Sequence, residues 1–319
     1  MLATGGTIST SQNKEKGGLV NTYSGEELIK GVEAPIEVEV INFSKMSSVY
    51  LTPQNMFELA KVAQDYLDQA DVVGVVVTHG TSTMEETSFM LDLLIDSPKP
   101  IVITGSQKSS TDSWPDGPSN LENAIRVAAD ESSVGKGVII VFANRIYEGK
   151  DAKKIHTTAL NAFDSGEKGI LGYVYSDKVI YHRERQRKFL KVAEFNSPYV
   201  EVIKFYTGAG NTFFEAAMNK GVKGIVVEGV GLGNVNKDFY NGIKQARERE
   251  IEVVIATRCY NGRVLPKYAY EGGGVSLERL GVIFGGALSS PKARLLLMLL
   301  LNNQVPHTQM QEAFNLYSN

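Results

Sequence analysis

The chain has 319 residues, of which 43% are hydrophobic and 22% are charged, and its formal net charge is -3. This composition is typical of a globular protein that buries a full core in two domains or one large one. The small negative charge gives no electrostatic reason to expect nucleic acid or an anionic membrane as a partner, and we expect neither.

Metal centres and disulfides are also not expected. The single cysteine, Cys259, excludes an intrachain disulfide framework, and the four histidines form no metal-ligand spacing with it. We therefore expect no metal and no cofactor. No apolar stretch is long enough to span a bilayer. Because the chain starts almost at its first expected turn, the predicted location is cytoplasmic for the chain as it stands, and periplasmic or secreted if an N-terminal signal was removed.

Predicted strands and helices alternate along the first half of the chain. The expected elements are, in order, a polar loop at 9–21, a helix capped near Ser24 with Glu26 and Glu27 in its first turn, strand 36–41, helix 53–67, strand 72–77, helix 85–95, strand 101–104, helix 119–130 and strand 138–142. Strand 72–77 shows no polar alternation, which is typical of a parallel strand buried on both faces. The order predicts βαβ units around a parallel sheet.

The second half shows the same alternation after a charged interruption. Residues 182–188 are basic and favour a solvated connector, and turn chemistry follows at 196–198. Beyond it we expect strands at 200–205, 224–227 and 253–256 and helices at 211–219, 237–249 and 291–302. The predicted fold is α/β, with a larger N-terminal parallel-sheet domain (1–180) that carries helices on both faces, a linker (181–199) and a smaller C-terminal α/β domain (200–319).

Two hydroxyl-rich turns, 3–8 and 78–86, each follow an apolar stretch. Glycine lets the backbone turn sharply and approach a ligand, and threonine offers a hydroxyl on a stiff side chain. Open α/β sheets bind small molecules at the carboxyl ends of their strands, so the two turns predict a nucleophilic hydroxyl there. The alternative interpretation is a pair of loops whose threonines only cap helices.

A threonine nucleophile needs a base and an oxyanion stabiliser. The backbone N–H groups of 5–7 and of 80–81 can serve a carboxylate or an oxyanion. Segment 149–158 follows a buried strand and carries three lysines. A desolvated lysine can act as a base through a lowered pKa, but the residues alone do not select Lys154 over its neighbours.

The two turns, in this order, resemble the two active-site signatures of the bacterial-type L-asparaginase/glutaminase amidohydrolases. Further matches at 116–121, 229–234 and 291–294 extend the resemblance over nearly the whole chain. The resemblance implies hydrolysis of a small amide, L-asparagine, to L-aspartate and ammonia through a threonine acyl-enzyme. It also implies a homo-oligomer, a dimer or a tetramer, whose subunits share active sites.

Carried over by position, the resemblance assigns roles to nine residues. The catalytic residues would be Thr7 as nucleophile, Thr81 and Lys154 as the second pair, and Tyr23 as an assistant from the flexible loop. The substrate-binding residues would be Ser48 for the α-carboxylate, with Ser47 as a less favoured occupant of that place, Gly80, Ser82, Asn234 from an adjacent subunit, and Glu271 for the α-amino group. Tyr23 is also compatible with a packed residue ahead of the Ser24 cap.

Ser82 departs from the family pattern, which has aspartate at this position against the substrate ammonium group. Val49 similarly follows Ser48 where some members carry glutamate. Three hypotheses result: an L-asparagine amidohydrolase, an amidohydrolase for a different small amide (D-asparagine, or N-acylated or peptide-linked asparagine), and a catalytically weak binding subunit. The presence of Thr7, Thr81 and Lys154 together argues against the third.

Overall fold

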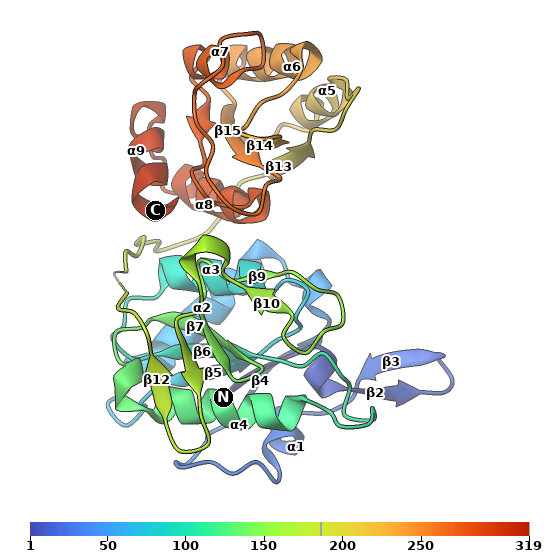
Figure 1. The fold of residues 1–319 in the computed structure, drawn as a ribbon, viewed down its shortest axis with the longest axis vertical. Helices are drawn as coiled ribbons and strands as arrows, with labels where there is room; N and C mark the ends of the chain where they lie inside the picture. The colour runs from blue at the N-terminus through green and yellow to red at the C-terminus, as the bar shows by residue number, and fades with distance from the viewer. Residues whose placement is uncertain (186, 319) are drawn as a thin grey trace. The chain divides into compact units, whose positions relative to one another are not determined.

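The computed structural model describes residues 1–185 and 187–318. The chain divides into two compact units, Met1–Lys191 and Val192–Asn319, and this boundary falls inside the segment 181–199. Each unit is an α/β layer structure with its own sheet (Figure 1).

The first unit contains an eight-stranded sheet in the order β12-β11-β8-β7-β6-β5-β1-β4. Its strands are β1 (Leu2–Gly5), β4 (Ile41–Met46), β5 (Val75–Thr78), β6 (Ile101–Thr104), β7 (Val138–Phe142), β8 (Arg145–Glu148), β11 (Gly172–Val174) and β12 (Val179–Tyr181). Five adjacent strands pair in parallel, in the sheet order β4, β1, β5, β6 and β7. Strands β8, β11 and β12 pair antiparallel at the β7 side of the sheet. The carboxyl ends of five parallel strands therefore meet at one edge.

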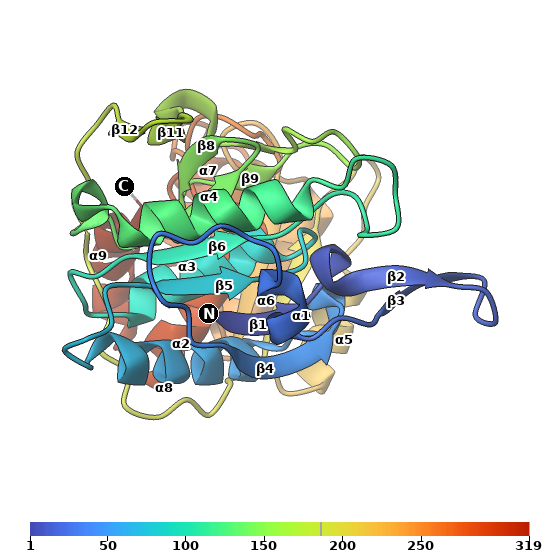
Figure 2. The same cartoon turned by 90° about the horizontal axis from the view of Figure 1, so that it is seen from below.

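Helices cover both faces of this sheet (Figures 1 and 2). Helices α1 (Gly25–Ile29) and α4 (Gly117–Ala129) lie on one face, and α2 (Pro53–Leu67) and α3 (Met84–Leu94) lie on the other. Successive residues of β5 divide between the two cores, since Val75 and Val77 pack with α2 and α3 while Val76 packs with α4. Burial on both faces explains why this strand shows no polar alternation.

Side-chain caps start two of these helices where the sequence places them. The Ser24 side chain accepts from the Glu27 N–H and Glu27 accepts from the Ser24 N–H, which closes a capping box ahead of α1. Thr52 and Asn55 form the same reciprocal pair ahead of α2, which has Pro53 at its first position.

Short elements surround the sheet. They are the hairpin β2 (Thr10–Asn13) and β3 (Gly18–Asn21), the pair β9 (Lys153–Lys154) and β10 (Phe163–Asp164), and the 3-10 turns η1 (Thr7–Ser9), η2 (Ser48–Tyr50), η3 (Glu131–Ser133) and η4 (Gly166–Lys168). Figure 2 shows the hairpin projecting away from the sheet.

The second unit contains a parallel sheet in the order β13-β14-β15-β16. Its elements are β13 (Val200–Lys204), α5 (Thr212–Asn219), β14 (Gly224–Gly229), α6 (Lys237–Glu248), β15 (Glu252–Thr257), α7 (Gly274–Arg279), β16 (Ile283–Phe284), α8 (Ser290–Asn302) and α9 (His307–Ser318). Phe214, Phe239 and Leu277 from α5, α6 and α7 share one core with the sheet, while α8 packs against β13, β14 and β15.

The predicted fold class is confirmed: a larger N-terminal, mostly parallel sheet with helices on both faces is joined to a smaller α/β unit. Two local predictions were wrong. The expected loop at 9–21 is a hairpin, and the expected strand at 36–41 pairs with β1 only from Ile41 onward. Ile36 and Val38 instead line a cavity, where Ile36 is exposed and Val38 is half-buried, and they form no strand ladder.

The basic stretch 182–188 was wrongly interpreted as a solvated connector. The side chain of Arg185 is 2% exposed, and its guanidinium forms ion pairs with Asp92 and Glu148. Arg183 also pairs with Glu148, at 2.7 Å. Arg187 donates to the carbonyl oxygens of Ile95 and Ser97. These contacts attach the segment to the first unit; Gln186 lies outside the described residues.

Candidate active site

Two glycines bring the hydroxyl-rich turns into backbone contact at the carboxyl edge of the sheet. Strands β1 and β5 are neighbours, with Ala3 opposite Thr78. A Cβ atom on Gly6 would lie 2.4 Å from both Cα and N of Gly80, so the two backbones leave no room for a side chain. Gly6 also has φ 86°, which favours glycine. The turn that contains Thr7 therefore lies against the turn that contains Thr81.

Ser48 joins these turns from a third strand. It follows β4, is 3% exposed, and its Oγ atom would lie 2.7 Å from a Cβ on Gly80. The Ser48 carbonyl accepts a hydrogen bond of 2.9 Å from the Thr83 hydroxyl. The loops after β1, β4 and β5 thus contribute Thr7, Ser48 and Gly80 to one region.

Lys154 reaches Thr81 from β9. Its Nζ atom donates to Thr81 Oγ1 at 2.7 Å, and its backbone N–H donates to the Glu85 carboxylate at 2.6 Å. Burial lowers the pKa of Lys154 from its usual range. The contact distinguishes Lys154 from Lys150 and Lys153, which the sequence alone could not do.

Gln107 is a member of this cluster that the sequence analysis missed. It follows β6, and its Oε1 atom accepts from Lys154 Nζ at 3.2 Å. Asp116 fixes the loop, because its carboxylate accepts the backbone N–H groups of Gln107 and Lys108. The position of Gln107 after a buried parallel strand was the available signal.

The buried side chain of His79 forms hydrogen bonds that stabilise the turn at 78–86. It is fully buried, with Nδ1 2.7 Å from the Gly80 carbonyl and Nε2 2.9 Å from Thr87 Oγ1. Burial lowers the pKa of His79 to about 4. The ring is therefore neutral at pH 7, with Nδ1–H donating to Gly80 and Nε2 accepting from Thr87.

The remaining candidates of the first unit lie in different surroundings. Thr7 is half-buried at the start of η1, and Ser82 is exposed in the turn before α3. Tyr23 lines a cavity of about 380 Å³ between α1 and the start of α4, together with Ile8 and Leu28. Its backbone N–H donates to the carbonyl oxygen of Ser9, the last residue of η1.

Asn234 and Glu271 belong to the second unit. Asn234 closes a tight turn with Val230, and its Oδ1 atom is buried without a hydrogen-bond partner among residues 1–185 and 187–318. Glu271 is 54% exposed and pairs with Lys237 Nζ at 2.9 Å.

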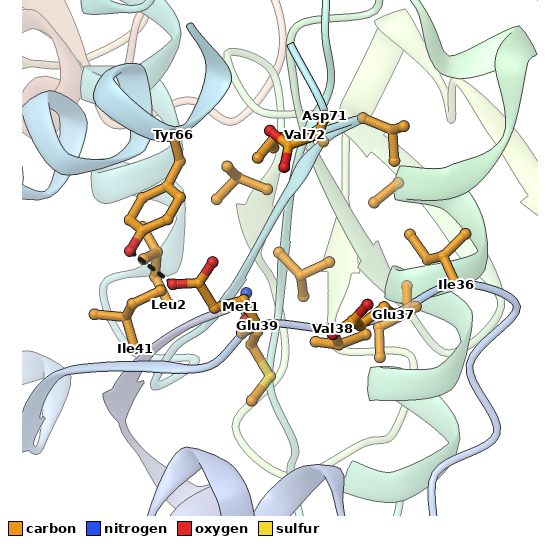
Figure 3. Close-up of a pocket in the computed structure, with 16 residues that line it drawn as sticks. Met1, Leu2, Ile36, Glu37, Val38, Glu39, Ile41, Tyr66, Asp71 and Val72 are labelled. Carbon is orange, nitrogen blue, oxygen red and sulfur yellow. Dashed lines mark hydrogen bonds between the residues drawn. The ribbon is translucent and has the colours of Figure 1, made fainter. Parts of the chain in front are cut away.

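A second cavity lies at the opposite, amino-terminal edge of β1 and β5. Its volume is about 380 Å³. Apolar side chains line it together with Glu37, Glu39 and Asp71, and the Tyr66 hydroxyl donates to Glu39 (Figure 3). None of the nine candidate site residues lines it.

Among the described residues, no group of three or more His, Cys, Asp or Glu side chains is arranged to hold a metal ion. None of the helices in 1–185 and 187–318 is long and apolar enough to cross a bilayer.

The arrangement defines a class: a two-unit α/β protein with a threonine–lysine pair at the carboxyl edge of a parallel sheet. Comparison with known families matches residues 1–187 to the N-terminal asparaginase domain and residues 199–314 to the glutaminase/asparaginase C-terminal domain. The chain belongs to the asparaginase family, whose members are hydrolases acting on amide C–N bonds.

Individual relatives agree over nearly the full length. The chain is 34% identical to an L-asparaginase of Bacillus licheniformis, covering 94% of both chains. It is 33% identical to L-asparaginase 2 of Escherichia coli, covering 99% of this chain and 92% of the relative. The crystal structure of a probable cytoplasmic L-asparaginase from Campylobacter jejuni matches with a TM-score of 0.86 at 31% identity, covering 98% of each chain.

Proposed function

We propose that this protein hydrolyses L-asparagine to L-aspartate and ammonia through an acyl-enzyme on Thr7. The observation that carries the proposal is the hydrogen bond of 2.7 Å between Lys154 Nζ and Thr81 Oγ1, beside the Gly6–Gly80 contact that fixes the Thr7 turn. The names of the relatives support the same substrate.

In the proposed reaction, Thr7 Oγ attacks the side-chain amide carbonyl of the substrate. The new C–O bond forms as the C–N bond breaks, and the hydroxyl proton leaves with the nitrogen as ammonia. Water then attacks the ester, which releases the carboxylic acid and restores the Thr7 hydroxyl. Lys154 and Thr81 promote these proton transfers, and the burial that lowers the pKa of Lys154 favours its free-base form.

Other residues bind the substrate in this proposal. Ser48 holds the α-carboxylate next to Gly80, and Glu271 holds the α-amino group. Asn234 completes the site of an adjacent subunit in a dimer or tetramer. Tyr23 assists the nucleophile from the segment that follows the hairpin.

A second candidate function follows from Ser82. An exposed hydroxyl carries no negative charge for a substrate ammonium group. D-asparagine, or asparagine whose amino group is acylated or peptide-linked, is therefore the alternative substrate class. A catalytically weak binding subunit is the remaining alternative, and the Lys154–Thr81 contact disfavours it.

The test is ammonia release from L-asparagine, D-asparagine, L-glutamine, N-acetyl-L-asparagine and an asparagine-containing dipeptide, with Thr7→Ala as the blank. Turnover of free L-asparagine that disappears in Thr7→Ala supports the proposal. Turnover of D-asparagine or of the blocked amides, without turnover of free L-asparagine, selects the second candidate. An active Thr7→Ala protein overturns the nucleophile, and no release from any amide favours the binding subunit.

A further inference from the structure

Gln107 contacts the threonine–lysine pair with a neutral side chain, since its Oε1 atom accepts a hydrogen bond from Lys154 Nζ at 3.2 Å. We propose that Gln107 is a positioning residue, whose amide oxygen orients the Lys154 amine toward the Thr81 hydroxyl without giving it a counter-charge. The inference rests on the proposed role of Lys154 in proton transfer. It adds to that role a residue from the loop after β6, the fourth parallel strand whose carboxyl end contributes to the site.

The geometry gives Gln107 Oε1 two neighbours in the pair. It lies 3.2 Å from Lys154 Nζ and 3.5 Å from Thr81 Oγ1, while Nζ and Oγ1 are 2.7 Å apart. These three atoms form a closed triangle of donors and acceptors. An amine N–H that points to Gln107 leaves the nitrogen lone pair free to accept the Thr81 hydroxyl proton.

The orientation of the amide is determined by its second bond. Gln107 Nε2 donates to the Ala159 carbonyl at 2.9 Å. A flipped amide would place Nε2 against the Lys154 amine and Oε1 against a carbonyl oxygen, which would lose both bonds. The carboxylate of Asp116 holds the Gln107 backbone at 3.0 and 3.1 Å. Gln107 is thus fixed at its backbone and at both ends of its amide.

The charged groups around Lys154 are engaged elsewhere. Glu85 accepts the Lys154 backbone N–H, and Asp116 accepts the N–H groups of the Gln107 loop. On the strand itself, Lys153 lies opposite Asp164 in the β9–β10 ladder. In the adjoining loop, His156 Nδ1 accepts the N–H groups of Thr158 and Ala159.

The Lys154 ammonium therefore lacks a direct carboxylate partner within residues 1–185 and 187–318, and burial acts on it unopposed. A neutral amide suits this environment because it accepts a hydrogen bond without strongly favouring the charged amine. A carboxylate in its place would favour the ammonium form.

The experiment compares Gln107→Glu and Gln107→Leu with Gln245→Glu, which adds the same charge at an exposed position of α6. Two readouts are used: the pH dependence of kcat/KM for ammonia release, and the titration of the Lys154 Cε signal in protein labelled with ¹³C-lysine, assigned with Lys154→Arg. Near-UV circular dichroism checks that each variant is folded.

We expect Gln107→Glu to move the acidic limb of the activity profile and the Lys154 titration to higher pH. At neutral pH this corresponds to a loss of kcat/KM of about tenfold or more, because an opposite charge within hydrogen-bonding reach favours the ammonium. Gln107→Leu lowers kcat by about tenfold without moving the limb upward, because the amine loses its orientation but gains no charge. Gln245→Glu changes neither readout.

An unchanged Lys154 titration in Gln107→Glu would overturn the proposal, and so would full activity of Gln107→Leu. The second of these variants carries the test if the first does not fold. The titration does not require turnover, so it decides the role of Gln107 even if wild-type protein releases ammonia from none of the amides. That result would count against the proposed function alone.

Discussion

Gly6 and Gly80 lie in backbone contact, since a Cβ atom on Gly6 would come within 2.4 Å of the Gly80 Cα and N atoms. The two glycines belong to turns that are more than 70 residues apart in the chain but follow neighbouring strands, β1 and β5. This contact sets the separation of Thr7 from Thr81 by main-chain packing.

Gly6→Ala is expected to lower the free energy of unfolding by about 3 kcal/mol or more and to abolish activity, because φ is 86° and the new methyl group meets backbone atoms. Gly80→Ala is expected to lower stability less than Gly6→Ala and to lose activity, because its methyl group displaces the Oγ and Cβ atoms of Ser48. Urea unfolding and ammonia release measure both effects. Gly210→Ala, with nothing within 4 Å, is the control; an active Gly6→Ala enzyme would contradict the close contact.

Lys154→Met should lower kcat by about 10²–10⁴-fold while leaving stability nearly unchanged, because it keeps an unbranched side chain of similar volume and removes the proton-transfer group. Lys154→Arg should also be inactive, because a guanidinium stays protonated. In the wild type, activity should rise with pH as Lys154 loses its proton, and burial places this rise below the usual lysine range. Rates measured across pH 5 to 10 check the expectation, and a profile that falls over this range would contradict a free-base role.

Local signals made much of the first unit predictable. Two helix starts were predictable because their caps depend on short-range hydrogen bonds: Ser24 and Thr52 each bond the residue three positions later, and Pro53 occupies the first position of α2. The hydroxyl-rich turns were placed correctly because strand ends in a parallel sheet share one edge, which the pairing of β1 with β5 bears out.

The features that were not predicted from the sequence depend on contacts between residues far apart in the chain. Gln107 reaches Lys154 across 47 residues, and Arg185 reaches Asp92 across 93 residues. Neither contact produces a periodic pattern in the sequence. A basic segment that contains a buried arginine therefore has the same sequence pattern as a basic segment that is fully exposed. The apolar residues Ile36 and Val38 were also misread, because they alternate with polar residues as in a strand, whereas in the structure they line a cavity.

His79 predicts a specific loss of stability in acid. Its pKa is about 4 in the folded protein and near 6.5 when unfolded, so below pH 6.5 the unfolded chain binds more protons. Stability therefore falls as pH drops from 6.5 to 4, by about 3 kcal/mol from this group. The difference in urea-unfolding free energy between wild type and His79→Gln isolates it from the carboxylates. If the two proteins lose equal stability between pH 6.5 and 4, the neutral-histidine assignment fails.

Arg185→Met should lower the free energy of unfolding by about 3 kcal/mol, because the buried carboxylates of Asp92 and Glu148 lose their shared partner and keep only Arg187 and Arg183. Lys244→Ala is the matched control, because its pair with Glu248 is exposed on both sides and contributes less than about 1 kcal/mol. Chemical unfolding of both variants measures the contrast. Equal stabilities would show that Arg185 is not the anchor of its segment.

Ser82→Asp tests which amide the site prefers. Ser82 is exposed in the turn that follows Thr81, and a carboxylate there would add a charge-assisted hydrogen bond to a free ammonium group. Such a bond contributes about 1.5–3 kcal/mol, so kcat/KM for L-asparagine should rise by about tenfold or more. N-acetyl-L-asparagine, which has no ammonium group, should gain nothing, and Ser82→Asn should behave as wild type because it adds no charge. Equal gains on both substrates would exclude charge recognition as the cause, and no gain on either would mean that another group already holds the ammonium.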